Sequence, residues 1–397
     1  MKTLFMTGSL VHGGAERHTI TLVNRLAERG HECHAVYVKN DPSQLERLRN
    51  ATSVECLHAA RYFDPSAVRR LASLIEREQP TSILAANQYA MLYASLARRL
   101  AGSRAPLAVV WHTTFVSTAK EHVQMVYYRP FFWNADCVVY VCEAQRRHWH
   151  PRLVRGRRNE IIHNGVDTGH WKPASEAVRA ATRAQLGLDE RDYVVGLSAV
   201  LRPEKNHVQL VDAVAALRRR GIPARALLIG DGPTRGAVEA RARALGIDGH
   251  VIITGFQRDV RPFVAAADTM VLTSFAEALS LAALEGMAMG KPVVHSEVGG
   301  AAEIIRPGRE GFLFPVGDTP ALVEHLAVLA KPGVRAAMGA NARERVELQL
   351  SERAMVDRYE KLLSQLETPG VAGEPLPARP VVTPARSAVR ADLSKIA

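Results

Sequence analysis

Two carboxylates lie eight residues apart in a stretch of the chain that is otherwise small and apolar. They are Glu277 and Glu285 in the segment SFAEALSLAALEGMAMGKPVV, which runs from Ser274 to Val294. Carboxylates are rarely buried unless a partner group stabilises them. Their oxygens accept hydrogen bonds from sugar hydroxyls. The pair would therefore suit a ligand rich in hydroxyl groups, if an anion site lay between them.

The residues between the two glutamates predict such an anion site. Ser280 is a good N-cap for a helix from Leu281 to about Met289. The backbone N–H groups of Ser280, Leu281 and Ala282 would point out of the helix start and attract an anion. Glu285 would lie about 7–8 Å along the helix axis from the cap. The alternative is one surface glutamate and one helix glutamate that share no ligand.

A basic loop is expected near this site. The segment LRPEKNH brings Arg202 and Lys205 to the end of a predicted strand. Two cations at a strand end suit a diphosphate, because each phosphate prefers a charge-assisted donor. A solvated surface pair is the alternative interpretation.

Glycine-rich loops follow two further predicted strands. GDGP contributes Gly230 and Gly232, and GSLVHGGAERH near the start contributes Gly13 and Gly14. Glycine lets a backbone N–H approach a phosphate closely. The second loop lacks the GxGxxG spacing of dinucleotide-binding folds, and plain turns remain the alternative for both loops.

Strand-like and helix-like runs alternate along the chain, which favours parallel sheets covered on both faces. Strands are predicted at residues 4–8, 34–38, 82–86, 107–111 and 137–141, and then at 194–200, 224–230, 251–255, 269–274 and 292–296. The polar segment 171–192 interrupts this rhythm and reads as a connector. We expect an α/β protein with two doubly wound, Rossmann-like domains, residues 1–170 and 171–350. Ligands should bind at the carboxyl ends of the strands.

The end of the chain has a different character. A last amphipathic helix is predicted over residues 351–366, and we expect it to pack back on the first domain. From residue 367 to 397 the sequence is rich in Pro, Ala, Arg and Val without periodicity. Such a composition predicts a disordered tail.

Length, composition and charge indicate the broad class of protein. The 397 residues exceed what one hydrophobic core usually serves, so two domains are expected. No run is long and apolar enough for a membrane span and the start is too short for a secretory leader, which predicts a cytoplasmic protein. The four cysteines lack metal-ligand spacing and suit buried thiols. The net charge of +11 suits a phosphorylated ligand, an anionic membrane or a nucleic acid.

Taken together, these motifs resemble the retaining glycosyltransferases of family 4, which have the GT-B fold of two doubly wound domains facing a central cleft. Glu277 and Glu285 look like the family's E-x7-E motif, and LRPEK looks like its R-x-x-K loop. GDGP, HNGVD, VGGAAEII, GFLFPVGD and GGAER are also similar to family segments. The similarity spans about residues 1–366 and is looser in the first domain. One departure is Ser280, where family members often have glycine.

The resemblance implies a role for each residue. Arg202 and Lys205 would hold the diphosphate of a nucleotide-sugar donor, Glu277 would contact the sugar and Glu285 the ribose. Backbone amides near Gly14 and Ser280 would assist the phosphates. The donor is a co-substrate, so no cofactor is expected, and no metal is expected because cations can replace one.

The resemblance also implies roles for residues of the first domain. His112, in WHTTF at a strand end, matches a histidine that faces the transferred sugar, with a structural role as the alternative. His163 and Asn164 would shape the turn between the domains. The run Arg146–Arg158 contains six arginines and suits an anionic membrane surface, with a solvated basic face as the alternative. The acceptor would then be a glycan or a lipid-linked glycan, as in relatives that build surface polysaccharides or lipopolysaccharides.

The sequence also leaves alternatives for the donor nucleotide and for the function. UDP is favoured over GDP as the donor nucleotide on base rates alone. A nucleotide-sugar epimerase could use the same fold, and a nicotinamide oxidoreductase would need the GxGxxG loop that is missing. A non-catalytic nucleic-acid-binding protein is suggested only by charge, and since no recognition motif supports it we expect no nucleic-acid partner.

Overall fold

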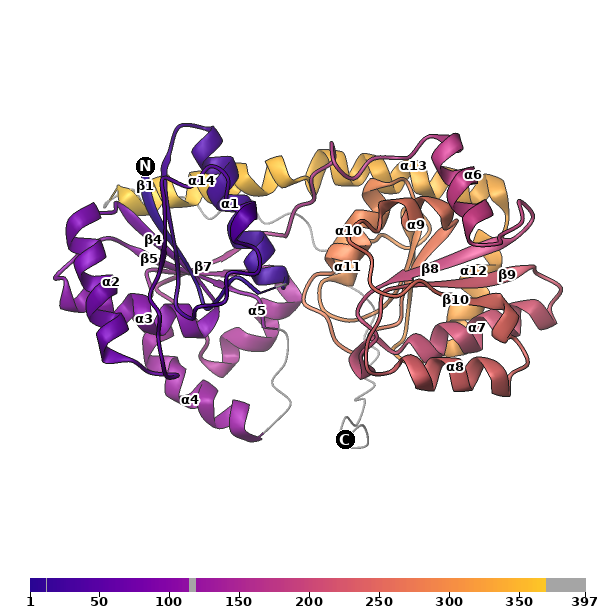
Figure 1. Cartoon of the computed structure of the whole chain (residues 1–397), viewed down its shortest axis with the longest axis horizontal. Coiled ribbons are helices and arrows are strands. Elements are labelled where there is room, and N and C mark those ends of the chain that lie inside the picture. The colour runs from indigo at the N-terminus through magenta and orange to yellow at the C-terminus, as the bar shows by residue number, and fades with distance from the viewer. Residues whose placement is uncertain (12, 114–118, 369–397) are drawn as a thin grey trace. The chain divides into compact units, whose positions relative to one another are not determined.

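The structure is a computed structural model that describes residues 1–11, 13–113 and 119–368. The chain divides into two compact units. Unit 1 contains Met1–Asn164 together with the described residues from Arg353 onward, and unit 2 contains Gly165–Glu352. Both units are shown in Figure 1.

Unit 1 is built on a seven-stranded parallel sheet with the strand order β3-β2-β1-β4-β5-β6-β7. Its strands are β1 (Lys2–Thr7), β2 (Glu32–Tyr37), β3 (Ser53–Cys56), β4 (Ser82–Ala86), β5 (Leu107–Trp111), β6 (Cys137–Tyr140) and β7 (Arg158–Ile161). Its helices are α1 (Gly14–Glu28), α2 (Pro65–Glu78), α3 (Asn87–Leu100), α4 (Ala119–Trp133), α5 (Glu143–Trp149) and α14 (Glu352–Glu367), with short 3-10 turns η1 (Leu45–Arg47) and η2 (His150–Arg152). Strands β4 and β5 are fully buried apolar runs, as expected for a sheet covered on both faces.

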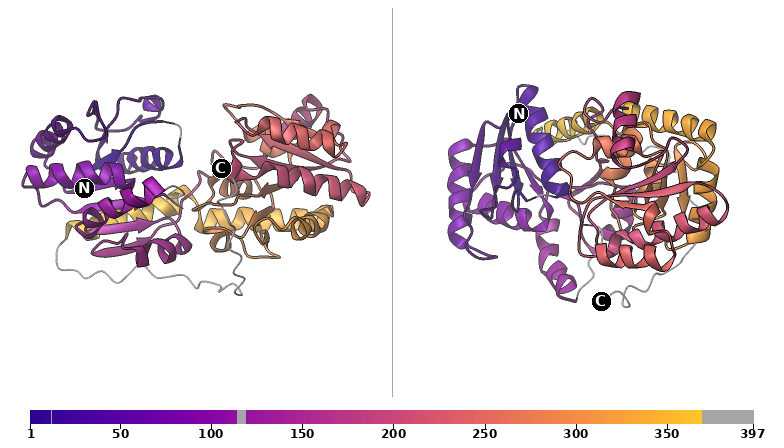
Figure 2. Two further views of the ribbon diagram at one scale, coloured as in Figure 1. Left: turned by 90° about the horizontal axis from the view of Figure 1, so that it is seen from below. Right: turned by 45° about the vertical axis from the view of Figure 1, so that its right-hand side comes forward.

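Unit 2 repeats this architecture with a six-stranded parallel sheet of order β10-β9-β8-β11-β12-β13. Its strands are β8 (Tyr193–Ser198), β9 (Ala224–Ile229), β10 (Val251–Ile253), β11 (Thr269–Leu272), β12 (Val293–Ser296) and β13 (Gly311–Phe314). Its helices are α6 (Glu176–Gln185), α7 (His207–Arg219), α8 (Arg235–Ala244), α9 (Arg261–Ala266), α10 (Leu281–Ala288), α11 (Ala301–Ile304), α12 (Thr319–Leu329) and α13 (Pro332–Gln349), with 3-10 turns η3 (Pro203–Lys205) and η4 (Asp248–His250). In each unit, helices lie on both faces of the sheet (Figure 2).

The α/β class with two doubly wound sheets is confirmed. Three strands were not predicted: β3, β7 and β13. All three are four residues long and lie at a sheet edge. Strands β3 and β7, with the sequences SVEC and RNEI, contain charged residues and form no apolar run, whereas β13, GFLF, is short but apolar.

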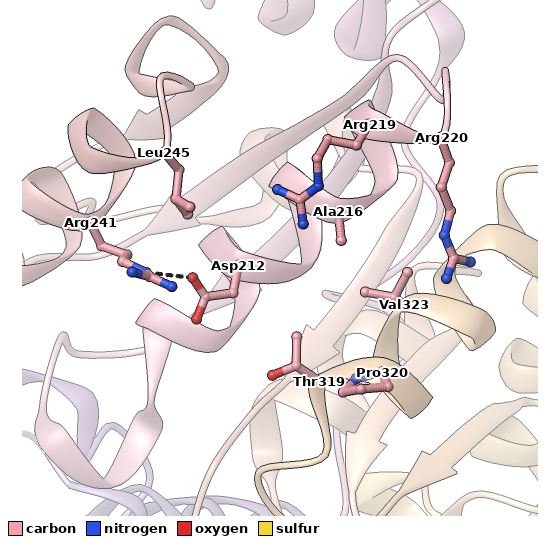
Figure 3. A pocket seen from close by; sticks show the side chains of 9 residues that line it. All are labelled: Asp212, Ala216, Arg219, Arg220, Arg241, Leu245, Thr319, Pro320 and Val323. Atoms are coloured by element: carbon pink, nitrogen blue, oxygen red, sulfur yellow. Dashed lines mark hydrogen bonds and ion pairs between the residues drawn. The ribbon is translucent and has the colours of Figure 1, made fainter.

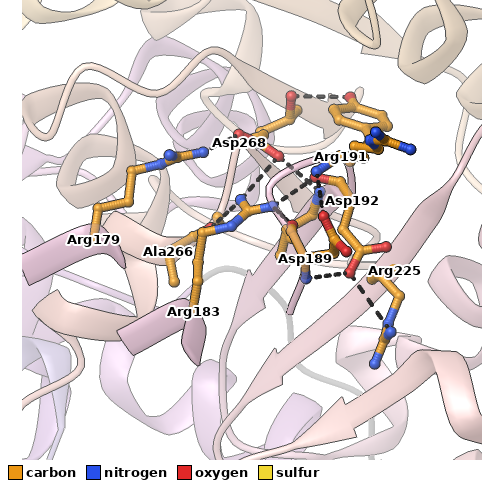
Figure 4. Close-up of polar contacts among 12 residues, drawn as sticks. Arg179, Arg183, Asp189, Arg191, Asp192, Arg225, Ala266 and Asp268 are labelled. Carbon is orange, nitrogen blue, oxygen red and sulfur yellow. Dashed lines mark hydrogen bonds and ion pairs between the residues drawn. The ribbon is translucent and has the colours of Figure 1, made fainter. Parts of the chain in front are cut away.

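The predicted connector at 171–192 is part of unit 2. It contains α6, whose Arg183 side chain is buried and donates to the carbonyl oxygens of Asp189 and Asp192, both at 2.7 Å, and of Ala266 at 3.1 Å. Asp268 accepts from Arg179 at 3.1 Å and lies 3.4 Å from Arg183 (Figure 4). The segment is therefore polar because its arginines form ion pairs with Asp268, next to the sheet.

Helix α14 belongs to unit 1, although it comes from the end of the described chain. Its Tyr359, Leu362 and Leu363 side chains are buried. Arg29 at the end of α1 forms an ion pair with Asp357 at 2.6 Å. Residues 369–397, which make up most of the predicted tail, lie outside the described residues.

None of the helices in the described ranges combines the length and the apolarity that a membrane crossing requires.

The burial of α14 gives the first prediction. Leu362→Ala should lower the free energy of unfolding by about 2–5 kcal/mol, because it removes a fully buried side chain and leaves a cavity. Lys361→Ala on the exposed face of the same helix should stay within about 0.5 kcal/mol of the wild type. Denaturant unfolding measures both values, and hydrogen exchange shows which unit opens. Equal effects of the two substitutions would contradict the packing of α14 in unit 1.

Candidate functional site

The sheet of unit 2 has a topological switch point between β8 and β11. Strand β8 lies between β9, which follows it along the chain, and β11, which comes later. At such a point the loops after the two strands leave in opposite directions and open a crevice, where ligands of doubly wound sheets usually bind. The predicted site residues Lys205 and Glu277 follow β8 and β11.

The loops after β8 and β11 are tied together through the backbone. The Thr273 hydroxyl lies 2.9 Å from the carbonyl oxygens of both Lys205 and Asn206. The backbone N–H of Phe275 donates to the carbonyl oxygen of Glu204 at 2.8 Å. Asn206 has a left-handed backbone with φ of 49°, so the chain turns sharply from the 3-10 turn η3 into α7. These contacts fix the backbone of both loops, from which the Lys205 and Glu277 side chains extend.

Lys205 and Glu277 form a direct ion pair. The Ser274 hydroxyl donates a second hydrogen bond to the same carboxylate oxygen of Glu277 at 3.1 Å. The two side chains are 25% and 15% exposed, so the pair is reachable from solvent but largely enclosed. An ammonium group has three N–H donors, so Lys205 can hold Glu277 and still donate to a ligand oxygen.

Helix α10 begins where the sequence predicted. Ser280 is its N-cap, and the Ser280 hydroxyl accepts from the backbone N–H of Ala283 at 3.3 Å. The N–H groups of Leu281 and Ala282 fall in the first turn, where an α-helix offers no backbone acceptor of its own. Glu285 lies on the same helix and is only 7% exposed. The structure thus places a helix start beside Glu277 and a buried carboxylate further along α10.

The loop after β12 also contacts Glu277, which the sequence motifs did not reveal. Gly299 has φ of 53°, and a side chain at this position would overlap the carbonyl oxygen of Glu277. The backbone N–H of Gly300 donates to the carbonyl oxygen of Ala278 at 2.7 Å. The position of Glu277 therefore depends on a glycine in the segment VGGAAEII.

His295, at the carboxyl end of β12, is a further residue that was missed. Its ring is buried, and Nδ1 lies 2.7 Å from the Ser296 carbonyl oxygen. Burial lowers the pKa of His295, while the negative charge of Glu277 acts in the opposite direction. The rule that ligands bind at strand ends would have identified His295, because PVVHS was predicted as a strand.

Arg202 does not join the ion pair. Its side chain is 61% exposed and lies 4.0 Å from Glu204, which is a long contact. The structure therefore places Arg202 on the same loop as Lys205, with a side chain that remains open to a ligand.

Gly230 and Gly232 have a packing reason to be glycine. A side chain at Gly230, where φ is 145°, would overlap the carbonyl oxygen of Ala199, and one at Gly232 would overlap Leu201. Ala199 and Leu201 belong to the loop that leads to Arg202. The two glycines therefore let the loop after β9 approach the loop after β8.

In unit 1 the start of α1 differs from the open anion site that was expected. Gly13 is the N-cap with an extended backbone, and Gly14 is the first helical residue. The carboxylate of Glu16 folds back close to Gly13, and burial raises the pKa of Glu16. An anion bound at this helix start would have to displace Glu16.

His112 follows β5, and its backbone N–H donates to the Asn87 side chain at 2.9 Å. Its ring packs edge-on against the buried ring of His18, with 4.8 Å between the centroids. Burial lowers the pKa of His112 to about 4, so the imidazole is neutral at pH 7. Within the described residues, Nε2 of His112 is buried and has no hydrogen-bond partner.

Other predicted features lie away from these residues. Asn164, in the segment HNGVD, is 8% exposed, and Gly165 begins unit 2. In the described ranges, no group of three or more His, Cys, Asp or Glu side chains could hold a metal ion. A surface hollow of about 370 Å³ is lined by residues of α7, α8 and α12 (Figure 3). None of the site residues named above lines this hollow.

The glycine after β12 gives the second prediction. Gly299→Ala and Gly317→Ala both force alanine into a left-handed backbone, which costs about 1–2 kcal/mol. Only Gly299→Ala also overlaps Glu277, so it should lower the midpoint of thermal unfolding further than the Gly317 control. Thermal denaturation of both variants measures this difference. Equal midpoints would contradict the close approach.

Two family models match the chain. The model of glycosyl transferases group 1 matches residues 178–345, and the model of glycosyltransferase family 4 matches residues 12–170. The two matches lie almost wholly within unit 2 and unit 1, respectively.

Several related proteins match over long stretches of the chain. The GDP-mannose-dependent alpha-(1-6)-phosphatidylinositol monomannoside mannosyltransferase of Mycolicibacterium smegmatis is 32% identical over 70% of this chain and 75% of its own length. The lipopolysaccharide core biosynthesis glycosyltransferase LpsE of Rhizobium meliloti is 29% identical over 89% of this chain and 96% of its own length. EpsD of Bacillus subtilis is 30% identical over 60% of this chain, and the match spans 64% of that relative.

A solved structure agrees in fold. The crystal structure of Anabaena Alr3699/HepE in complex with UDP aligns with a TM-score of 0.81, covering 92% of this chain and all of that one at 23% identity. This alignment and the two parallel sheets agree on the fold, while both family matches and the mannosyltransferase relative show the family: the chain belongs to the family 4 glycosyltransferases and has their GT-B fold.

Proposed function

We propose that this protein transfers a sugar from a nucleoside diphosphate sugar to a hydroxyl group of an acceptor glycan, with retention of configuration. The observation that carries the proposal is the Lys205–Glu277 pair at the switch point of unit 2. A cation and a carboxylate held side by side suit a ligand that carries phosphate next to hydroxyl groups.

The contacts suggest how the donor binds. Lys205 and Arg202 would bind the diphosphate, with N–H groups of Ser280, Leu281 and Ala282 assisting at the start of α10. Glu277 would accept hydrogen bonds from sugar hydroxyls and Glu285 from the ribose. Gly13, Gly14, Gly230 and Gly232 would shape loops around the phosphates, although Glu16 must move if Gly14 is to contact one.

The reaction breaks the bond between the anomeric carbon and the phosphate oxygen of the donor. A new bond forms from the anomeric carbon to the acceptor oxygen on the same face of the sugar, and the acceptor proton passes to the leaving diphosphate. The protein positions both substrates and stabilises the charge that develops on the leaving diphosphate. His112, neutral at pH 7, would donate to or accept from a hydroxyl of the transferred sugar.

We infer the identity of the donor nucleotide and of the acceptor from the relatives. The solved Alr3699/HepE structure is a complex with UDP, which supports UDP as the donor nucleotide here. The mycobacterial relative is a GDP-mannose-dependent enzyme, which makes GDP the alternative. The relative named for lipopolysaccharide core biosynthesis supports a surface glycan as acceptor, free or lipid-linked. An epimerase remains the second candidate, and it would convert the donor without any acceptor.

Removal of the Lys205 ammonium group should affect turnover far more than folding. Lys205→Ala should lower kcat by roughly 10²–10³, the loss typical when a group that stabilises transition-state charge is removed. Its thermal midpoint should stay close to that of Lys172→Ala, a control at an exposed lysine of unit 2. Near-wild-type transfer by Lys205→Ala in a donor consumption assay would refute this role.

The proposed chemistry needs no metal, since Lys205 and Arg202 supply the positive charge at the diphosphate. Transfer should therefore persist in EDTA, and added Mg²⁺ or Mn²⁺ should change the rate by less than about twofold, far below a main electrostatic contribution. Nucleotide sugars should raise the midpoint of thermal unfolding, because a ligand bound to the folded state stabilises it. Loss of transfer in EDTA, with recovery on adding metal, would overturn the metal-free proposal.

A further inference from the structure

Helix α4 is apolar on two faces, of which only one is covered. Met125, Tyr128 and Phe132 point into the core of unit 1 and are at most 5% exposed. Large apolar side chains gathered on an exposed face commonly mark a surface that contacts a partner or a membrane. The second face of α4 therefore requires an explanation.

That second face forms a continuous exposed stripe. Val123, Val126, Tyr127 and Trp133 are 71%, 55%, 55% and 48% exposed, and Pro130 between them is exposed as well. Their spacing of three, four, seven and ten residues from Val123 places them along one side of the helix. Figure 1 shows α4 beside α3 at the periphery of unit 1.

Two more exposed aromatic residues lie in a loop that is linked to α4 through the buried Tyr128. Tyr62 and Phe63, in the loop between β3 and α2, are 48% and 46% exposed. The Tyr62 hydroxyl is hydrogen-bonded to the hydroxyl of Tyr128 on α4. We name the apolar residues together the α4 surface: Tyr62, Phe63, Val123, Val126, Tyr127 and Trp133.

Arginines border the α4 surface at its Trp133 end. The Trp133 indole N–H donates to the carbonyl oxygen of Leu153 at 3.0 Å, so the segment after η2 lies against the helix. Arg152 and Arg155 on either side of Leu153 are exposed, and Arg157 is 71% exposed while paired with Asp136 at 3.2 Å.

Ion pairs neutralise part of the basic run Arg146–Arg158. At its two ends, Arg146 is paired with Glu143 at 2.8 Å, and Arg158 with Glu160 at 2.7 Å. Arg147, 54% exposed, lies 4.0 Å from Glu143, while the exposed Arg152 and Arg155 lie next to Leu153 along the chain and therefore near Trp133.

We propose that the α4 surface binds an anionic lipid bilayer, with Arg152 and Arg155 on the lipid headgroups. Tyrosine and tryptophan favour the membrane–water interface, where the ring is in an apolar zone and the polar atom is hydrated. Basic side chains next to an interfacial helix add attraction to anionic lipids. An exposed apolar patch with a charged border is the kind of surface that marks such a contact.

A second copy of the chain fits this surface less well. In a two-fold symmetric dimer centred on this patch, the Trp133 end of one copy meets the Val123 end of the other. Arg152 and Arg155 would then face apolar residues of the α4 surface, whereas an anionic bilayer complements their charge. The bilayer is therefore the occupant that both the apolar and the basic residues favour.

The proposal deepens the proposed function and rests on it in one respect, the nature of the acceptor. Strands β3 and β5 are parallel members of one sheet, so the loop after β3 and the residues after β5 emerge at the same edge. Tyr62 and His112 lie in those positions. A bilayer held by the α4 surface would present a lipid-linked glycan on the sheet edge that contains His112.

Flotation with vesicles tests the proposal. The full chain should bind vesicles of phosphatidylcholine with phosphatidylglycerol at low salt, and bind phosphatidylcholine alone much more weakly. Val123→Glu with Val126→Glu should lower the partition coefficient at least about tenfold, because two apolar contacts are lost. The matched control, Val178→Glu with Val328→Glu, changes two helix valines of unit 2 that are 43% and 39% exposed, and it should bind like the wild type.

Arg152→Gln with Arg155→Gln tests the electrostatic part. Each neutralisation should weaken binding to the anionic vesicles about fivefold at low salt and leave the weak binding to phosphatidylcholine unchanged. Thermal midpoints and the stabilisation by a nucleotide sugar should match the wild type in all these variants. Donor binding therefore reports on the proposed function independently of the vesicles.

Three outcomes would overturn the proposal. One is wild-type protein that stays unbound with anionic vesicles at low salt. Another is a double valine variant that floats as well as its control. The third is a concentration-dependent dimer in solution that Val123→Glu with Val126→Glu abolishes, because it would show that a second copy covers the surface.

Discussion

The adjacency of β8 and β11 is the constraint on which the candidate site depends. These strands lie far apart along the chain, yet parallel pairing brings their carboxyl ends together at the position where ligands of doubly wound sheets usually bind. Hydrogen bonds from Thr273 to the backbone of Lys205 and Asn206 then fix the two loops against each other. With the backbone held in this way, a lysine from one loop and a glutamate from the other meet without further adjustment.

The resulting pair is arranged before any ligand arrives. Lys205 and Glu277 neutralise each other, Ser274 donates to the carboxylate, and Gly299 packs against the backbone of Glu277. An incoming phosphate would share the ammonium group with Glu277, and the carboxylate would retain oxygens for hydroxyl groups. Such preorganisation reduces the entropy lost on binding and favours a ligand that offers phosphate and hydroxyl groups together. His295 contributes a buried ring behind this pair.

Local features of the sequence could be predicted, and long-range ones could not. Ser280 and the start of α10 follow from capping chemistry within a few residues, and the central strands follow from their apolar runs. The pairing of Lys205 with Glu277 depends on strand order, which the pattern of strands and helices does not specify. The edge strands β3 and β7 were missed because they contain charged residues and form no apolar run, whereas β13, GFLF, was missed although it is apolar. The role of α6 was missed because the ionic contact between Arg183 and Asp268 joins residues that are far apart in sequence.

Helix α14 has a consequence for how the protein is made. Unit 1 needs this helix for its core, since Tyr359 and Leu362 are buried there, yet α14 follows all of unit 2 along the chain. During synthesis from the N-terminus, unit 2 is therefore available to fold before the last piece of unit 1 has emerged. Unit 1 is therefore completed after unit 2, and its apolar face for α14 stays uncovered on the ribosome until all of unit 2 has been made.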